Sequence, residues 1–151
     1  LGLTPGSKIL LDDIEAEMIY VKHPPEPPIA PQWADLPGEP NSIWLMKLDG
    51  KTILHVGDTT DDPAFDRIAA ENPKIDIAML PLWSNGLAGT VDTAINTLLS
   101  IIPKLHPSIV LLHNRWEPER PAYKAFVERT KGFDFGETKI LPQQIGTEVE
   151  F

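Results

Sequence analysis

The stretch that decides the fold runs from residue 42 to residue 58 and reads SIWLMKLDGKTILHVGD. Two mainly apolar runs flank Asp49-Gly50, a pair that readily adopts the positive φ angles of a tight type I′ turn. The stretch therefore predicts a β-hairpin whose second strand ends at Val56-Gly57-Asp58. An isolated hairpin is only marginally stable, so these two strands have to join a larger sheet.

Segments on both sides of the hairpin predict the rest of the sheet and its helices. Alternating or continuous apolar runs predict strands over residues 8–11, 14–21, 75–82, 108–112, 138–141 and 146–151. Apolar residues spaced three and four apart predict helices after Asp62-Pro63, from Val91 to Ile102 with Pro103 as the stop, and from Pro121 to Lys131. Strands that alternate with helices indicate the α/β class.

Size, charge and composition exclude several classes of protein. The 151 residues, 42% of them hydrophobic, suit one compact domain. Its 13 Lys and Arg against 22 Asp and Glu give a net charge of −9, which argues against a nucleic-acid surface but allows a small anionic substrate. Without cysteine, disulfides and thiolate metal sites are impossible. No apolar run predicts a membrane span and no signal peptide is visible, so we expect a cytoplasmic protein.

A proline-rich segment interrupts the predicted strands. Residues 24–40 hold seven of the sixteen prolines, a density that no helix or central strand tolerates. Such a long irregular segment in one domain is usually functional. We predict a mobile or conditionally ordered loop over one domain, which could serve as a lid or a partner surface.

Three potential metal ligands follow predicted strands. They are His23, Asp58 and His113. Sites in α/β sheets gather outside the carboxyl ends of strands, and imidazole and carboxylate groups suit zinc or iron. A strand-end histidine is more often a surface residue, and an aspartate after glycine is often a helix cap, although Asp61 and Asp62 compete for that role. His55, inside the hairpin, is predicted to face the helical layer or solvent.

Residues 53–59, 75–81 and 106–113, in this order, resemble the second half of metallo-β-lactamase-fold hydrolases. The nearest branch looks like that of the ascorbate-6-phosphate lactonases and the tRNA 3′-processing nucleases. The opening Leu3-Thr4-Pro5-Gly6, with a strand running into His23, is similar to the family segment that carries a further histidine. The resemblance implies an αββα sandwich, with residues 1–151 as a single domain forming its C-terminal portion.

The resemblance also assigns roles to individual residues. It makes His23 and His113 metal ligands and Asp58 the bridging, catalytic carboxylate. Residues after strand ends are candidates for the substrate-binding rim, namely Asn85, Asn114 and Arg115. Arg115 could hold an anionic substrate group, or it could pair with a neighbouring surface glutamate.

One family signature, His-x-His-x-Asp-His, is absent from these 151 residues. It normally lies upstream, and a chain that starts at Leu1 fits a piece without that half. We therefore expect a metal-dependent hydrolase of an ester, lactone or phosphoester when the upstream half is present as partner. Its cofactor would be zinc, as one or two ions, or manganese or iron. This chain alone should bind metal weakly and be inactive.

Two other functions fit the same residues. The chain could be a non-catalytic relative that keeps the fold and uses its proline-rich loop for protein contacts. It could also be a generic α/β binding domain in which the three ligands coincide by chance.

Overall fold

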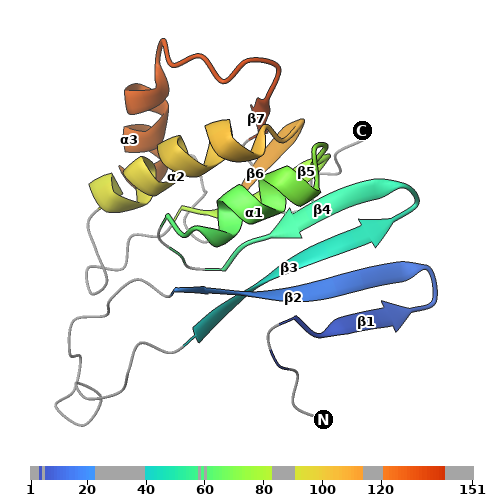
Figure 1. Cartoon of the computed structure of the whole chain (residues 1–151). Coiled ribbons are helices and arrows are strands. Elements are labelled where there is room, and N and C mark those ends of the chain that lie inside the picture. Colours follow the sequence, from blue (N-terminus) through green and yellow to red (C-terminus); the bar gives the residue numbers. More distant parts are fainter. Residues whose placement is uncertain are drawn as a thin grey trace, which may run out of the picture.

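One seven-stranded sheet organises the chain, as the computed structural model shows (Figure 1). The structure describes residues 4, 6–22, 40–57, 59, 61–82, 91–113 and 121–141. The strands lie side by side in sequence order and are β1 (Lys8–Leu11), β2 (Ile14–Lys22), β3 (Pro40–Leu48), β4 (Lys51–His55), β5 (Ile77–Pro81), β6 (Ile109–His113) and β7 (Lys139–Leu141). The predicted α/β class is confirmed.

The sheet changes from antiparallel to parallel pairing at β4. Strands β1 to β4 form an antiparallel meander, and β4 to β7 are parallel to one another. The predicted hairpin is confirmed, because Asp49 and Gly50 have φ angles of 49° and 71°, as a type I′ turn requires. β4, the second strand of this hairpin, thus pairs with an antiparallel strand on one side and with a parallel strand on the other.

Three helices connect the parallel strands and cover one face of the sheet (Figure 1). They are α1 (Ala64–Glu71), α2 (Val91–Leu105) and α3 (Pro121–Thr130). Crossovers between parallel strands are right-handed almost without exception, so successive strands in sequential order receive their helices on the same face. None of these described helices has the length and hydropathy to cross a membrane.

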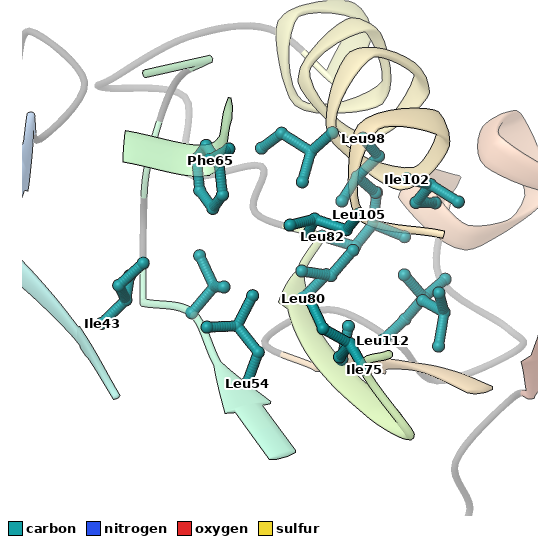
Figure 2. Packing of buried hydrophobic residues seen from close by; sticks show 14 of the residues in the cluster. Ile43, Leu54, Phe65, Ile75, Leu80, Leu82, Leu98, Ile102, Leu105 and Leu112 are labelled. Carbon is teal, nitrogen blue, oxygen red and sulfur yellow. The ribbon is translucent and has the colours of Figure 1, made fainter. Parts of the chain in front are cut away.

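The hydrophobic core lies between these helices and the covered face. Alternate residues in parts of β2 to β6 point into it, while the helices contribute their apolar stripes. Figure 2 labels its main members, which are Ile43, Leu54, Phe65, Ile75, Leu80, Leu82, Leu98, Ile102, Leu105 and Leu112. All ten are at most 2% exposed, so this layer is a closed, well-packed interior.

Helix α2 continues past the proline that was predicted to stop it. Pro103 lies inside the last turn, and the helix ends only at Leu105. The lost Pro103 N–H removes one helical hydrogen bond, but Leu105 is 2% exposed and its burial favours the extra turn. The stop comes from His106, which has a φ of 45° and is followed by Pro107.

One boundary of the proline-rich loop also shifts. The proline-rich loop was predicted to include Pro40, but Pro40 is the first residue of β3 and pairs with Lys22. The first position of a strand is one of the few places where a sheet tolerates proline. The preceding residues 24–39 and the predicted strand over residues 146–151 lie outside the described residues.

The other face of the sheet is apolar, and none of the described helices covers it. We call it the open face; its apolar members include Ala16, Met18, Trp44, Met46, Leu48, Ile53, Ile77, Met79, Ile109, Leu111 and Leu141, and it also carries Lys51, His55 and Lys139. None of these residues belongs to the core cluster, and most are partly exposed. Parallel sheets are normally buried on both faces, so an apolar sheet face in contact with solvent is unusual.

Asp76 fastens the amino ends of β4 and β5. Its carboxylate accepts the Thr52 amide at 2.9 Å and lies 3.1 Å from the Lys74 ammonium. Burial raises the pKa of the Asp76 carboxyl, but the Thr52 amide and the two nearby lysines outweigh burial and hold this pKa below its ordinary range. The folded state therefore stabilises the ionised Asp76 carboxylate more than the unfolded state does.

Two adjacent residues of β5 test the difference between the faces. Leu80→Ala should lower the free energy of unfolding by about 2–5 kcal/mol, because a fully buried side chain leaves a cavity. Met79→Ala, on the open face, should cost about 1 kcal/mol, since that side chain is only partly buried. Urea unfolding measures both, and equal losses would contradict the one-sided core.

Asp76 predicts a pH dependence of stability. Its folded pKa is depressed, so its contribution is complete above the unfolded-state pKa and is lost as the pH falls through the folded pKa. Asp76→Asn should lower the unfolding free energy by about 1.5 kcal/mol at neutral pH. The difference from wild type should shrink as the solution is acidified below about pH 4. Lys74→Met should reproduce part of this change, and a difference that stays constant down to about pH 2 would refute the assignment.

Candidate metal centre at the carboxyl edge of the sheet

The three strands that precede the predicted ligands end at the same edge of the sheet. β2 is antiparallel to β3, and β3 is antiparallel to β4, so β2 and β4 run in the same direction. β4 is parallel to β5, which is parallel to β6. The geometric premise of the predicted site is thus met. The side chains of His23 and Asp58 lie outside the described residues, so their convergence with His113 stays a prediction.

His113 is held firmly at this edge. It is the last residue of β6, where it pairs with Pro81, rather than the first residue after the strand as predicted. Its Nε2 lies 2.7 Å from the Val56 carbonyl oxygen, and because a carbonyl can only accept, Nε2 carries the proton. In the neutral ring the lone pair is then on Nδ1. Metal-ligating histidines commonly donate their other ring N–H to a backbone carbonyl in this way.

The hydrogen-bonded carbonyl belongs to the segment that leads into Asp58. Val56 is fully buried, and its amide donates to the Met79 carbonyl at 2.9 Å, which fixes the end of β4 to β5. Val56 precedes Asp58 by two positions in sequence. Val56, in the described segment that precedes Asp58, and the imidazole of His113 are therefore neighbours across β5.

His23 starts from farther away. It follows β2, which is separated from β6 by β3, β4 and β5. Four strand spacings correspond to roughly 19 Å between backbones. His23 can share a site with His113 only if the chain after Lys22 turns inward over the sheet edge.

The segment after Asp58 is anchored to helix α2. The Asp61 carboxylate accepts the Ser100 hydroxyl at 2.6 Å and the Lys104 ammonium at 2.7 Å. Burial raises the pKa of Asp61, but these two hydrogen bonds lower it further than burial raises it, so the carboxylate stays ionised. Thr59, between Asp58 and this anchor, is fully buried. The described residues on either side of Asp58, Val56 and Asp61, are thus both fixed to the fold.

The neighbouring Asp62 fulfils the predicted capping role. Its Oδ1 accepts the Ala64 amide at 2.8 Å, at the start of α1 and directly after Pro63. The two aspartates that compete with Asp58 as cap or turn residues are therefore engaged elsewhere. Asp62 caps α1 and Asp61 binds α2, so neither role falls to Asp58.

His55 is a site neighbour that the sequence did not reveal. It was predicted to face the helices or solvent; Leu54 and Val56 occupy the face that the helices cover, so His55 lies on the open face, where it is half-buried. There its ring stacks on His113, with centroids 5.3 Å apart and planes 9° from parallel. The only available signal was the two-residue alternation of β4, which shows that His55 and Leu54 differ in face but not which face is covered.

The predicted rim residues Asn85, Asn114 and Arg115 lie outside the described residues, so their role in binding substrate stays a prediction. Within the ranges that the structure does describe, no three His, Asp or Glu side chains form a group able to hold a metal ion. His113 is thus the one predicted site residue whose surroundings are defined.

Comparison with protein families gives a match over most of the chain. Residues 3–112 match the family model described as a β-lactamase superfamily domain. None of the curated proteins compared with the chain matches it.

Solved structures show the same fold. A metallo hydrolase from the hyperthermophilic archaeon Ignicoccus hospitalis is 16% identical, with a TM-score of 0.60 over 95% of this chain and 58% of its own. A putative metal-dependent hydrolase from Parabacteroides distasonis is 18% identical, with a TM-score of 0.59 over 94% and 57%. A metallo-β-lactamase fold protein from Bacillus subtilis is 12% identical, with a TM-score of 0.59 over 94% and 52%. The chain thus spans less than three fifths of the length of each of these proteins.

Proposed function

Because the chain belongs to the β-lactamase superfamily, we propose that it forms part of a metal-dependent hydrolase acting on an ester, lactone or phosphoester. The observation that carries this proposal is the hydrogen bond from His113 Nε2 to the Val56 carbonyl, beside the loop that carries Asp58. Within the superfamily, we propose that the chain belongs to the branch that includes the ascorbate-6-phosphate lactonases and the tRNA 3′-processing nucleases.

The donor set fits a metal such as zinc. His113 has its Nε2 proton engaged by a backbone carbonyl, so its Nδ1 carries the lone pair, which is the protonation pattern common in metal-ligating histidines. Together with Asp58 and His23 it would supply two imidazoles and a carboxylate, the ligand types of zinc, manganese and iron sites. When bound, the metal would lower the pKa of a water molecule and polarise the substrate's carbonyl or phosphoryl group. Asp58 would act as bridging ligand.

An anionic substrate would need local cations, because the chain as a whole is strongly acidic. We propose that Arg115 supplies this charge, with Asn85 and Asn114 as neutral partners on the rim of the site. A cytoplasmic location and the absence of nucleic-acid binding both stay predictions.

Metal binding tests this proposal in the chain itself. His113→Ala and Asp58→Ala should each weaken zinc binding by at least about tenfold, because each removes a ligand. Isothermal titration with ZnCl₂ measures the affinity, and the unfolding temperature shows whether the variant still folds. The control is His106→Asn, since His106 is exposed at the opposite edge and asparagine tolerates its positive φ. Zinc affinity equal to wild type in both site variants would refute the proposal.

We further propose that a second β-sheet, supplied by the upstream half of the same fold, covers the open face. The open face presents neighbouring apolar residues that are partly exposed, including Trp44, Met46 and Ile53. Two sheets pack face to face at about 10 Å by interdigitating such side chains. A small polar partner would leave most of these apolar side chains exposed to water.

The absence of native cysteine allows a direct test of this layer. Single cysteines replace Ile53 on the open face, Leu54 in the core and Val127 on the outer surface of α3. In the 151-residue chain, the cysteine at position 53 should react with a maleimide at a rate between the other two. In a polypeptide that also carries the residues preceding Leu1 in the gene, it should slow by at least about tenfold. The cysteine at position 127 should not change.

Two outcomes would contradict the second layer. One is an unchanged reaction rate at position 53 in the longer polypeptide. The other is a uniform slowing at positions 53 and 127, which would indicate general aggregation rather than burial of one face.

A further inference from the structure

His55 and His113 come from strands that are not neighbours. His55 ends β4 and lies opposite Met79, while His113 ends β6 and lies opposite Pro81. The two rings therefore meet across β5, with centroids 5.3 Å apart and planes inclined by only 9°. Offset-parallel contacts of this kind are a favoured arrangement of flat rings.

The stack and the hydrogen bond restrain different motions of the same ring. The hydrogen bond from Nε2 to the Val56 carbonyl fixes one edge of the His113 imidazole at 2.7 Å. On its own it still allows the ring to pivot about that contact. A second flat ring at 5.3 Å and nearly parallel restricts this pivot. The hydrogen bond thus restrains one edge of the His113 imidazole, and the stacked ring restrains its plane.

We propose that His55 is a positioning residue for His113. Its ring keeps the His113 imidazole in the orientation in which Nε2 donates to Val56 and Nδ1 carries the lone pair. The metal-binding consequence rests on the proposed function, whereas the orientation itself is a property of the metal-free chain. His55 acts through its flat ring and not through its ring nitrogens.

The same geometry argues that His55 is not a fellow ligand of the same ion. A histidine binds a metal in the plane of its own ring, along the lone pair of a nitrogen. Planes that are stacked and only 9° from parallel do not bring two in-plane lone pairs to one point. An ion in the plane of His113 would lie well outside the plane of His55.

Two substitutions separate the ring from its nitrogens. His55→Phe keeps a flat ring of similar width, and His55→Ala removes the ring. Nitrogen–proton correlation spectra of the metal-free chain, recorded near pH 8 where an unperturbed imidazole is neutral, report which His113 nitrogen carries the proton. Wild type and His55→Phe should show the Nε2–H form, whereas His55→Ala should show a mixture of both tautomers. His113→Asn identifies the signals, and the unfolding temperature confirms that each variant folds.

Zinc titration then measures the consequence for binding. His55→Ala should weaken zinc binding by about 10–100-fold, the usual effect of losing a group that orients a ligand. His55→Phe should stay within about threefold of wild type. An unchanged His113 tautomer in His55→Ala would overturn the positioning role. So would a loss of zinc binding in His55→Phe as large as in His55→Ala, because it would show that the His55 nitrogens matter.

The two proposals can fail separately. A wild-type chain that binds no zinc, even with its upstream half, refutes the metal-dependent function, while the spectra of the metal-free chain still decide whether His55 orients His113. Conversely, normal zinc binding by wild type with a His113 ring indifferent to residue 55 refutes only the positioning role.

Discussion

The hand of the crossover connections is the constraint on which the rest of the structure depends. Strands β4 to β7 are parallel and follow one another in sequence order, so each connection has to return on the same side. All three helices therefore lie on one face, and the core forms there. None of the described helices lies on the other face, although its strands carry many apolar residues there. Parallel sheets are normally covered on both faces, and these crossovers cover one of them.

The same topology creates the candidate site. Because β4 and β6 are parallel, the segments that leave them start at one edge although they are far apart in sequence. The hydrogen bond between His113 and Val56 joins these two segments across β5. The Asp61 contacts with Ser100 and Lys104 then tie the segment beyond Asp58 to α2. The site is thus assembled from strand ends whose positions are already set by the core.

Much of this arrangement could be predicted from the sequence, because its signals are local. The Asp49-Gly50 turn, the Asp62 cap and the apolar spacing of α2 each depend on a few consecutive residues. The predicted stop at Pro103 was wrong because a tertiary contact, the burial of Leu105, outweighed a local rule. The strand ends that carry the candidate ligands were predictable for the same local reasons. Their convergence is not a local property, and only the surroundings of His113 are defined.

The contact between His55 and His113 shows where local reasoning ends. Alternation along β4 places His55 and Leu54 on opposite faces of the sheet. Which of these faces is covered depends on α1 and α2, which come later in the chain. The partner ring, that of His113, belongs to β6, which is far from β4 in sequence. Nothing within the hairpin could have identified this pair.

The histidine pair belongs to the same side of the sheet as the open face, and this couples the two proposals. A second layer that covers Ile53 and Met79 would also exclude water from the neighbouring imidazoles. In a drier environment the hydrogen bond from His113 to Val56 becomes stronger, and a metal there has less competition from solvent. Metal binding would in turn stabilise the association of the two layers, because a ligand favours the state that binds it. On these proposals, completion of the sandwich and formation of the metal site are one linked equilibrium.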